Sequence, residues 1–87
     1  MNTEPNAVRP ILYGADWCLK TSGFKNFLQR EWVDFTYRNV EEDEAAAQRV
    51  RDHYEGKLKF PVLEIGDTWL KNPGMGELRQ VLRDHGL

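Results

Sequence analysis

The chain has 87 residues, which is the size of one small domain and too short for a second globular unit within it. Hydrophobic residues make up 40% and charged residues 30%, a composition typical of a folded globular domain rather than of a disordered or fibrous chain. The formal net charge is -2, which disfavours nucleic acid and anionic membrane surfaces as partners.

The cysteine count and the hydropathy of the chain further limit the kind of protein this can be. The single cysteine, Cys18, cannot form an internal disulfide, and together with only two histidines it makes a poor set of zinc ligands. The first eight residues are polar, and no apolar run approaches the roughly 20 residues that a membrane-spanning helix needs. We therefore expect a cytoplasmic protein without a leader or membrane segment, and without a resident metal.

The first half of the chain predicts a strand, a helix and a second strand. Residues 1–8 lack periodicity and are expected to form a flexible arm, which leaves 9–87 as the folded domain. A short apolar run at 11–13, closed by a glycine, predicts the first strand. The helix is indicated by apolar residues at i, i+3 and i+4 spacing, and the second strand by alternating rings and polar residues over 35–40.

The second half predicts a helix, a hairpin and a last helix. Segment 41–54 begins with four acids, continues through three alanines and is followed by Gly56, as expected for a helix and its C-terminal cap. Two short strands at 60–65 and 68–70 flank a Gly-Asp turn, and helical spacing of apolar residues resumes from Met75. The order β-α-β-α-β-β-α predicts an α/β three-layer sandwich around a four-stranded mixed sheet.

Cys18 lies between the predicted first strand and the predicted first helix, and this position indicates a reactive cysteine. Amide groups at a helix N-terminus stabilise a thiolate, so the pKa of Cys18 is expected below that of a free thiol, with Lys20 helping and Asp16 opposing. A lone cysteine is often only a small buried hydrophobe, whereas loops at the carboxyl ends of strands carry function in α/β proteins. Asp16 itself is expected to be a helix cap or loop acid.

The motif Tyr13-Gly14-x-x-Trp17-Cys18-x-x-Thr21, followed about forty residues later by Phe60-Pro61 and then by Gly74 before the last helix, resembles the glutaredoxins. The approach to Phe60-Pro61 is also similar to that of short, mycoredoxin-like members. This resemblance covers nearly the whole chain and implies a thioredoxin-like fold, with a cis peptide bond before Pro61 that faces Cys18.

The resemblance also implies roles for particular residues. Cys18 would be the nucleophile, the Thr21 hydroxyl would donate to its sulfur, and glutathione would be the co-substrate. The residues expected to contact substrate are Trp17, Leu19, Lys20, Phe60, Pro61, Gly74 and Met75.

The chain departs from the family pattern in three places. Thr21 replaces the second cysteine of the usual pair, which leaves a monothiol route through Cys-Leu-Lys-Thr. No lysine precedes Cys18 in its loop, unlike in the monothiol members that carry iron-sulfur clusters. In the turn that would hold glutathione, Pro73 lacks an N–H and Gly76 lacks a side chain, so weaker binding of glutathione is expected.

Three functions follow from these residues. The first is a monothiol glutaredoxin-like thiol–disulfide oxidoreductase of cell redox homeostasis, a monomer without a bound cofactor whose partners are glutathione or a disulfide-bearing client protein. The second is a catalytically weakened module that holds a peptide or a cofactor in the same place. The third is a dimer bridged by an iron-sulfur cluster, held by Cys18 of two chains and two glutathiones. Trp69, on the outer strand, is expected to pack on the last helix or to contact a partner.

Overall fold

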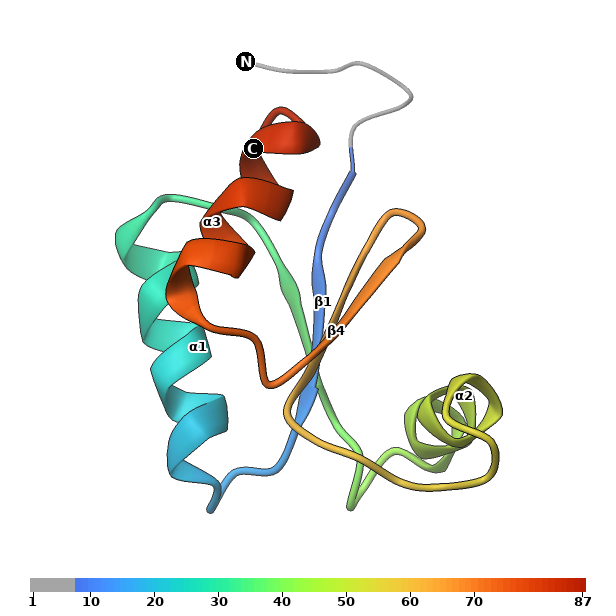
Figure 1. The fold of residues 1–87 in the computed structure, drawn as a ribbon. Helices are drawn as coiled ribbons and strands as arrows, with labels where there is room; N and C mark the ends of the chain where they lie inside the picture. Colours follow the sequence, from blue (N-terminus) through green and yellow to red (C-terminus); the bar gives the residue numbers. More distant parts are fainter. Residues whose placement is uncertain (1–7) are drawn as a thin grey trace.

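The computed structural model describes residues 8–87 and shows the expected order of four strands and three helices (Figure 1). They form an α/β sandwich with a four-stranded sheet in the middle layer. The elements are β1 (Ile11–Gly14), α1 (Leu19–Arg30), β2 (Thr36–Asn39), α2 (Glu44–His53), β3 (Val62–Ile65), β4 (Thr68–Lys71) and α3 (Met75–Asp84).

The sheet has the strand order β2-β1-β3-β4 and is mixed, as predicted. β1 pairs with β2 in parallel, with Ile11 opposite Thr36, because α1 supplies the long connection that a parallel pair requires. β3 runs antiparallel to both β1 and β4, and the hairpin between β3 and β4 turns at Gly66 with a φ of +60°. The carboxyl ends of β1 and β2 therefore meet at one edge, where the loop to α1 carries Cys18.

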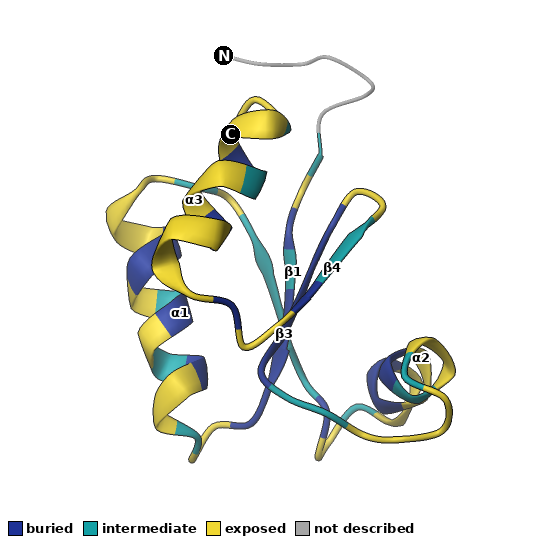
Figure 2. Cartoon of the chain, in the orientation of Figure 1, coloured by how far each residue is buried: buried dark blue, intermediate teal, exposed yellow. Residues whose placement is uncertain are grey.

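Each face of the sheet packs its own core, because successive strand residues point to opposite sides. α1 and α3 cover one face and α2 covers the other, and the buried positions in Figure 2 follow this division. The first core contains Leu12, Phe24, Phe27, Leu28, Leu63, Ile65, Leu70, Leu78 and Leu82. The second contains Tyr13, Val40, Ala46, Ala47, Val50 and Val62.

A buried polar network joins the second core to α2. Glu64 of β3 is buried and accepts a hydrogen bond from the Tyr13 hydroxyl at 2.8 Å. Arg49 of α2 forks onto the same carboxylate, with its Nε 3.0 Å from Oε1. Burial, reinforced by the bond to Glu64, raises the pKa of Tyr13 to about 12. The carboxylate thus has the partners that a buried charge requires.

Trp69 packs on α2 and not on α3, so the prediction that it would contact the last helix was wrong. Its ring stacks on His53 of α2, at 4.2 Å between centroids, and on Tyr13 of β1, at 5.7 Å. The reason is register, since Trp69 lies opposite Glu64 and therefore on the α2 face of the sheet.

Several predicted boundaries shift by a few residues. α2 begins at Glu44 rather than at residue 41, because Asp43 is the N-cap and its carboxylate accepts from the Ala46 amide at 3.0 Å. β3 begins at Val62, after Pro61. Of the predicted arm, residues 1–7 lie outside the described residues, and Val8 packs partly buried against the first core. None of the helices found between residues 8 and 87 has the length and apolarity to cross a membrane.

Candidate active site

Cys18 is the N-cap residue of α1, at the position the sequence predicted. Its amide donates to the Ala15 carbonyl at 3.1 Å, and its own carbonyl accepts the first helical hydrogen bond from Ser22 at 3.1 Å. The side chain is partly exposed. The loop after β1 therefore presents the sulfur to solvent at the amide end of a helix.

Thr21 lies in the first turn of α1 and is the largest influence on the pKa of the Cys18 thiol. A hydrogen bond from the Thr21 side chain is the largest influence that holds the pKa of Cys18 below its usual value. Burial opposes this shift, and the amides of Thr21 and Lys20 and the charge of Lys20 add to it. The Cys18 side chain makes no cap hydrogen bond to the amides of the first turn.

The Thr21 hydroxyl is held in place by its buried surroundings. Thr21 is fully buried, and its Oγ1 accepts a hydrogen bond from the Ala15 amide at 3.4 Å. An oxygen that accepts from an amide keeps its own proton free to donate to another acceptor. A Cβ on Gly14 would overlap the Thr21 side chain, so this packing requires a glycine at the end of β1. The sequence predicted Gly14 as the end of a strand and as part of the glutaredoxin-like motif, without this contact to Thr21.

An apolar rim, defined here as Trp17, Leu19 and Phe60, borders the cysteine. Trp17 is 66% exposed and Leu19 is 87% exposed. The Trp17 ring packs edge-on against Phe60, with centroids 5.8 Å apart, and its Nε1 donates to Glu41 at 2.9 Å. The Phe60-Pro61 peptide bond is cis, as the resemblance implied. The rim thus joins the loop of Cys18 to the segment before β3.

Asp16 takes part in an interaction that the sequence analysis missed. The Tyr37 hydroxyl of β2 donates to Asp16 Oδ1 at 2.8 Å, and Lys25 of α1 lies over the Tyr37 ring with its Nζ 4.1 Å from the centroid. Burial, followed by the effect of Asp16, raises the pKa of Tyr37 well above its usual range. The parallel pairing of β1 and β2 brings their carboxyl ends together, and this was the signal available in the sequence.

The remaining predicted site residues lie at the starts of helices. Lys20 is exposed in the first turn of α1, Gly74 is the N-cap of α3, and Met75 is its first residue, 43% exposed. Among the aromatic pairs found between residues 8 and 87, Trp17 contacts Phe60, and Thr21 is the largest influence on the pKa of Cys18.

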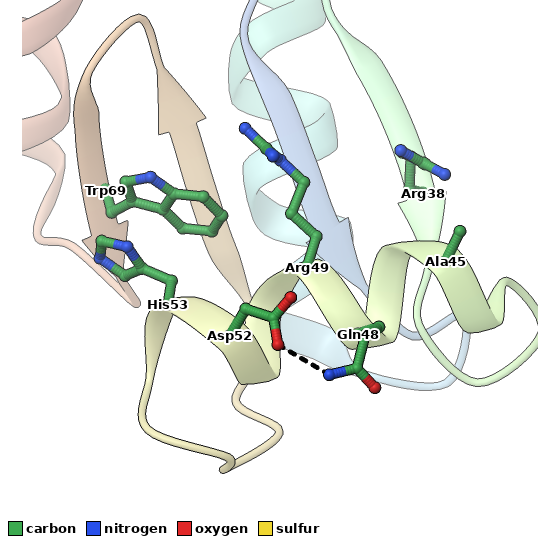
Figure 3. Close-up of a pocket in the computed structure, with 7 residues that line it drawn as sticks. All are labelled: Arg38, Ala45, Gln48, Arg49, Asp52, His53 and Trp69. Atoms are coloured by element: carbon green, nitrogen blue, oxygen red, sulfur yellow. Dashed lines mark hydrogen bonds between the residues drawn. The ribbon is translucent and has the colours of Figure 1, made fainter.

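A hollow of about 730 Å³ lies elsewhere, between α2 and β4 (Figure 3). Its charged side chains are already paired, since Arg38 forks onto Asp43, Arg49 binds Glu64, and the Gln48 amide donates to Asp52 at 2.8 Å. None of the predicted site residues lines it. The lining residues are Arg38, Ala45, Gln48, Arg49, Asp52, His53 and Trp69.

A comparison with solved structures defines the fold to which this chain belongs. The chain is similar to the thioredoxin-like protein BC3987, with a TM-score of 0.76 and 23% identity over 85% of this chain and 100% of that chain. It is similar to a glutaredoxin from Archaeoglobus fulgidus, with a TM-score of 0.72 and 23% identity over 90% and 89% of the two chains. A glutathione transferase homologue from Drosophila mojavensis, solved with bound glutathione, gives a TM-score of 0.63 at 21% identity, over 91% of this chain and 36% of that one. The fold is thioredoxin-like.

The family follows from the sequence profile. The profile of the glutaredoxin family matches residues 11–70, which span the strand before Cys18, the cis-proline and most of the hairpin. The chain belongs to the glutaredoxin family, and this supports a role of the thiol-oxidoreductase type. A comparison with curated proteins finds no match.

Proposed function

We propose that this protein is a monothiol thiol–disulfide oxidoreductase that uses glutathione and acts through Cys18. The observation that carries the proposal is the placement of Cys18 at the N-terminus of α1, where its side chain is partly exposed and the buried Thr21 lies in the same first turn. A thiolate, and not a thiol, attacks disulfides, so a thiol with a lowered pKa is prepared for exchange near neutral pH.

The proposed cycle needs only one protein sulfur. The Cys18 thiolate attacks the glutathione sulfur of a glutathionylated client, forms a Cys18–glutathione disulfide and releases the client as a thiolate, which takes a proton from water. A second glutathione, as its thiolate, attacks the glutathione sulfur bound to Cys18. This step yields oxidised glutathione and regenerates the Cys18 thiolate. The glutathionyl group of the client becomes one half of the oxidised glutathione, so one reduced glutathione is consumed for each client thiol released.

Thr21 serves the cycle by stabilising charge on sulfur. Cys18 carries negative charge before the first attack and again when it leaves in the second. A hydroxyl that donates to this sulfur stabilises both states, and the lower pKa that results makes Cys18 a better leaving group. Since Thr21 is not a thiol, nothing in the motif competes with glutathione for the mixed disulfide.

The start of α3 is the proposed contact for a glutathione carboxylate. Gly74 caps α3 without a side-chain hydrogen bond, so the amides of the first turn, from Met75 onward, remain available to an anion. Pro73 precedes the cap and is buried, and its missing N–H lies outside this first turn. Gly76 supplies no side chain, and for this reason we expect weaker glutathione binding than in members that carry an acid there.

The test is a glutathione-coupled assay on a glutathionylated peptide, with wild type and Cys18→Ser compared at equal concentration. We expect turnover by wild type that rises with glutathione concentration, and none by Cys18→Ser. Thr21→Ser, which keeps the hydroxyl, is the matched control and should retain most of the activity. Peptide binding by a wild-type protein that gives no turnover would refute the enzyme and support the binding module.

A further inference from the structure

Trp32 is the most exposed large apolar side chain between residues 8 and 87. It follows the C-cap of α1 and is 94% exposed, and its backbone φ is +57°. Residues other than glycine rarely adopt this left-handed backbone conformation. The turn after α1, drawn as exposed in Figure 2, therefore holds a tryptophan away from both cores of its own chain.

Two hollows flank this side chain. One of about 260 Å³ lies toward Phe35, and one of about 380 Å³ lies toward the C-terminus, and Trp32 and Val33 line both. The walls of the second include Val8 and Leu87, which is 42% exposed. An exposed aromatic side chain thus lies beside hollows whose walls combine apolar and charged side chains.

The charges around the same hollows are of both signs. Arg9, Glu31 and Asp34 line the hollow toward the C-terminus, and within residues 8–87 none of the three takes part in a salt bridge. The Arg9 guanidinium is held by the Phe35 carbonyl at 3.0 Å and the Thr36 hydroxyl at 2.9 Å, which fixes where its charge lies. A surface with a positioned cation beside carboxylates is complementary to a second copy of itself.

We propose that this surface, defined as Val8, Arg9, Trp32, Asp34 and Leu87, is the contact of a two-fold symmetric dimer of this chain. Each Trp32 occupies the hollow of its partner, and each Arg9 faces Asp34 across the axis. Isologous contacts have this form, since residue i meets j and j meets i. Tryptophan and arginine are the residues that most often dominate binding energy at such contacts.

The contact is expected to be weak. Two aromatic side chains that bury about 150 to 250 Å² each supply about 300 to 500 Å², well below the roughly 1,200 Å² of a stable interface. The dimer should therefore form only at high protein concentration. The sequence led us to expect a monomer, and at low concentration the chain would be one.

The contact leaves Cys18 accessible. α1 has 12 residues and separates Cys18 from the turn of Trp32 by about 18 Å along its axis. The proposal is therefore independent of the proposed redox function. A disulfide between two Cys18 residues would mimic a dimer, so the test is made on the full-length Cys18→Ser protein.

The test is sedimentation equilibrium from about 10 µM to about 1 mM, the range in which weak dimers dissociate. We expect the average mass to rise with concentration, and Trp32→Ala to weaken association by about 30-fold or more. Trp17→Ala, the matched control at the other end of α1, should leave association unchanged. In NMR titrations the Trp32 indole signal should shift with concentration while that of Trp69 does not.

Charge reversal tests the pairing itself. Arg9→Glu and Asp34→Arg should each weaken association, and the double variant should recover it, because it restores opposite charges across the axis. Sedimentation as a monomer over the whole range would overturn the proposal, as would association that survives Trp32→Ala. A Trp32 indole signal that shifts on removal of residues 1–7, but not with concentration, would instead identify the N-terminal segment as the occupant.

Discussion

Replacing Thr21 with valine removes one buried hydroxyl and keeps the shape of the side chain. The hydrogen bond to Cys18, the largest influence that lowers the pKa of its thiol, is then lost, while the amides at the start of α1 and the charge of Lys20 remain. We therefore expect the pKa of Cys18 to rise in Thr21→Val. In Thr21→Ser, which keeps the hydroxyl, it should stay close to the wild-type value.

The size of the effect follows from the kind of bond that is lost. A hydrogen bond to a charged group contributes about 1.5 to 3 kcal/mol, and the lower end applies here because Cys18 is partly exposed and water replaces part of the bond. That is about a tenfold loss of thiolate at a pH below the pKa. A more basic thiolate is intrinsically about threefold more nucleophilic, so the rate of exchange falls by only about threefold.

The sign of the effect reverses with pH, and this makes the prediction specific. Below both pKa values, Thr21→Val should react about threefold more slowly than wild type with a disulfide such as oxidised glutathione. Above both values, where each protein is fully ionised, it should react about threefold faster. The rate of wild type should reach half of its plateau at a lower pH than the rate of Thr21→Val does.

The assay is stopped-flow thiol–disulfide exchange across the pH range, with circular dichroism to confirm that each variant is folded. The check is needed because valine leaves the Ala15 amide without its acceptor, which costs about 1 to 3 kcal/mol if the amide stays dry. A folded Thr21→Val protein whose rate profile coincides with that of wild type would refute the role given to the hydroxyl.

Two further substitutions test the packing that supports the site. Glu64→Gln removes the ion pair with Arg49 and should lower the free energy of unfolding at pH 7 by about 1 to 2 kcal/mol, since half of the Arg49 side chain is exposed. The Arg49 hydrogen bond holds the pKa of Glu64 below its usual value, so the difference is full above about pH 4.3 and should vanish as the pH falls through the folded pKa. Urea unfolding at several pH values measures this, and a difference independent of pH would contradict it. Gly14→Ala should both destabilise the fold and slow exchange at the cysteine, because the added carbon overlaps Thr21. Gly23→Ala is its control, and with no atom within 4 Å of the added carbon in α1 it should be neutral or stabilise by up to about 1 kcal/mol.

The order of the elements was predictable because hydrophobic periodicity is local. The position of Cys18 was predictable for the same reason, since a strand, a glycine and a helical face lie in sequence around it. The exact start of α2 was not, because Glu41, Glu42 and Asp43 are all plausible helix-start acids. The choice of Asp43 depends on its contact with Arg38 of β2, which the sequence pattern does not show, and the Asp43 carboxylate then accepts from the Ala46 amide.

Features that depend on strand register could not be predicted from the sequence. The face of the sheet on which Trp69 lies is decided by its pairing with Glu64, and a shift of one residue would place it on the opposite side. The bond between Tyr37 and Asp16 likewise depends on the register that places Tyr37 opposite Leu12, although the parallel pairing of β1 and β2 could be predicted. The family resemblance supplied what local patterns could not, including the cis bond before Pro61.

The most direct test of the redox role is the intact mass of the protein after exposure to oxidised glutathione and then to reduced glutathione. One glutathione should add to each wild-type chain, at Cys18, and none to Cys18→Ser. Reduced glutathione should then remove it, more slowly than from relatives with a complete glutathione turn. A wild-type chain that gains no glutathione, or that keeps it in the presence of excess reduced glutathione, would contradict the proposed cycle.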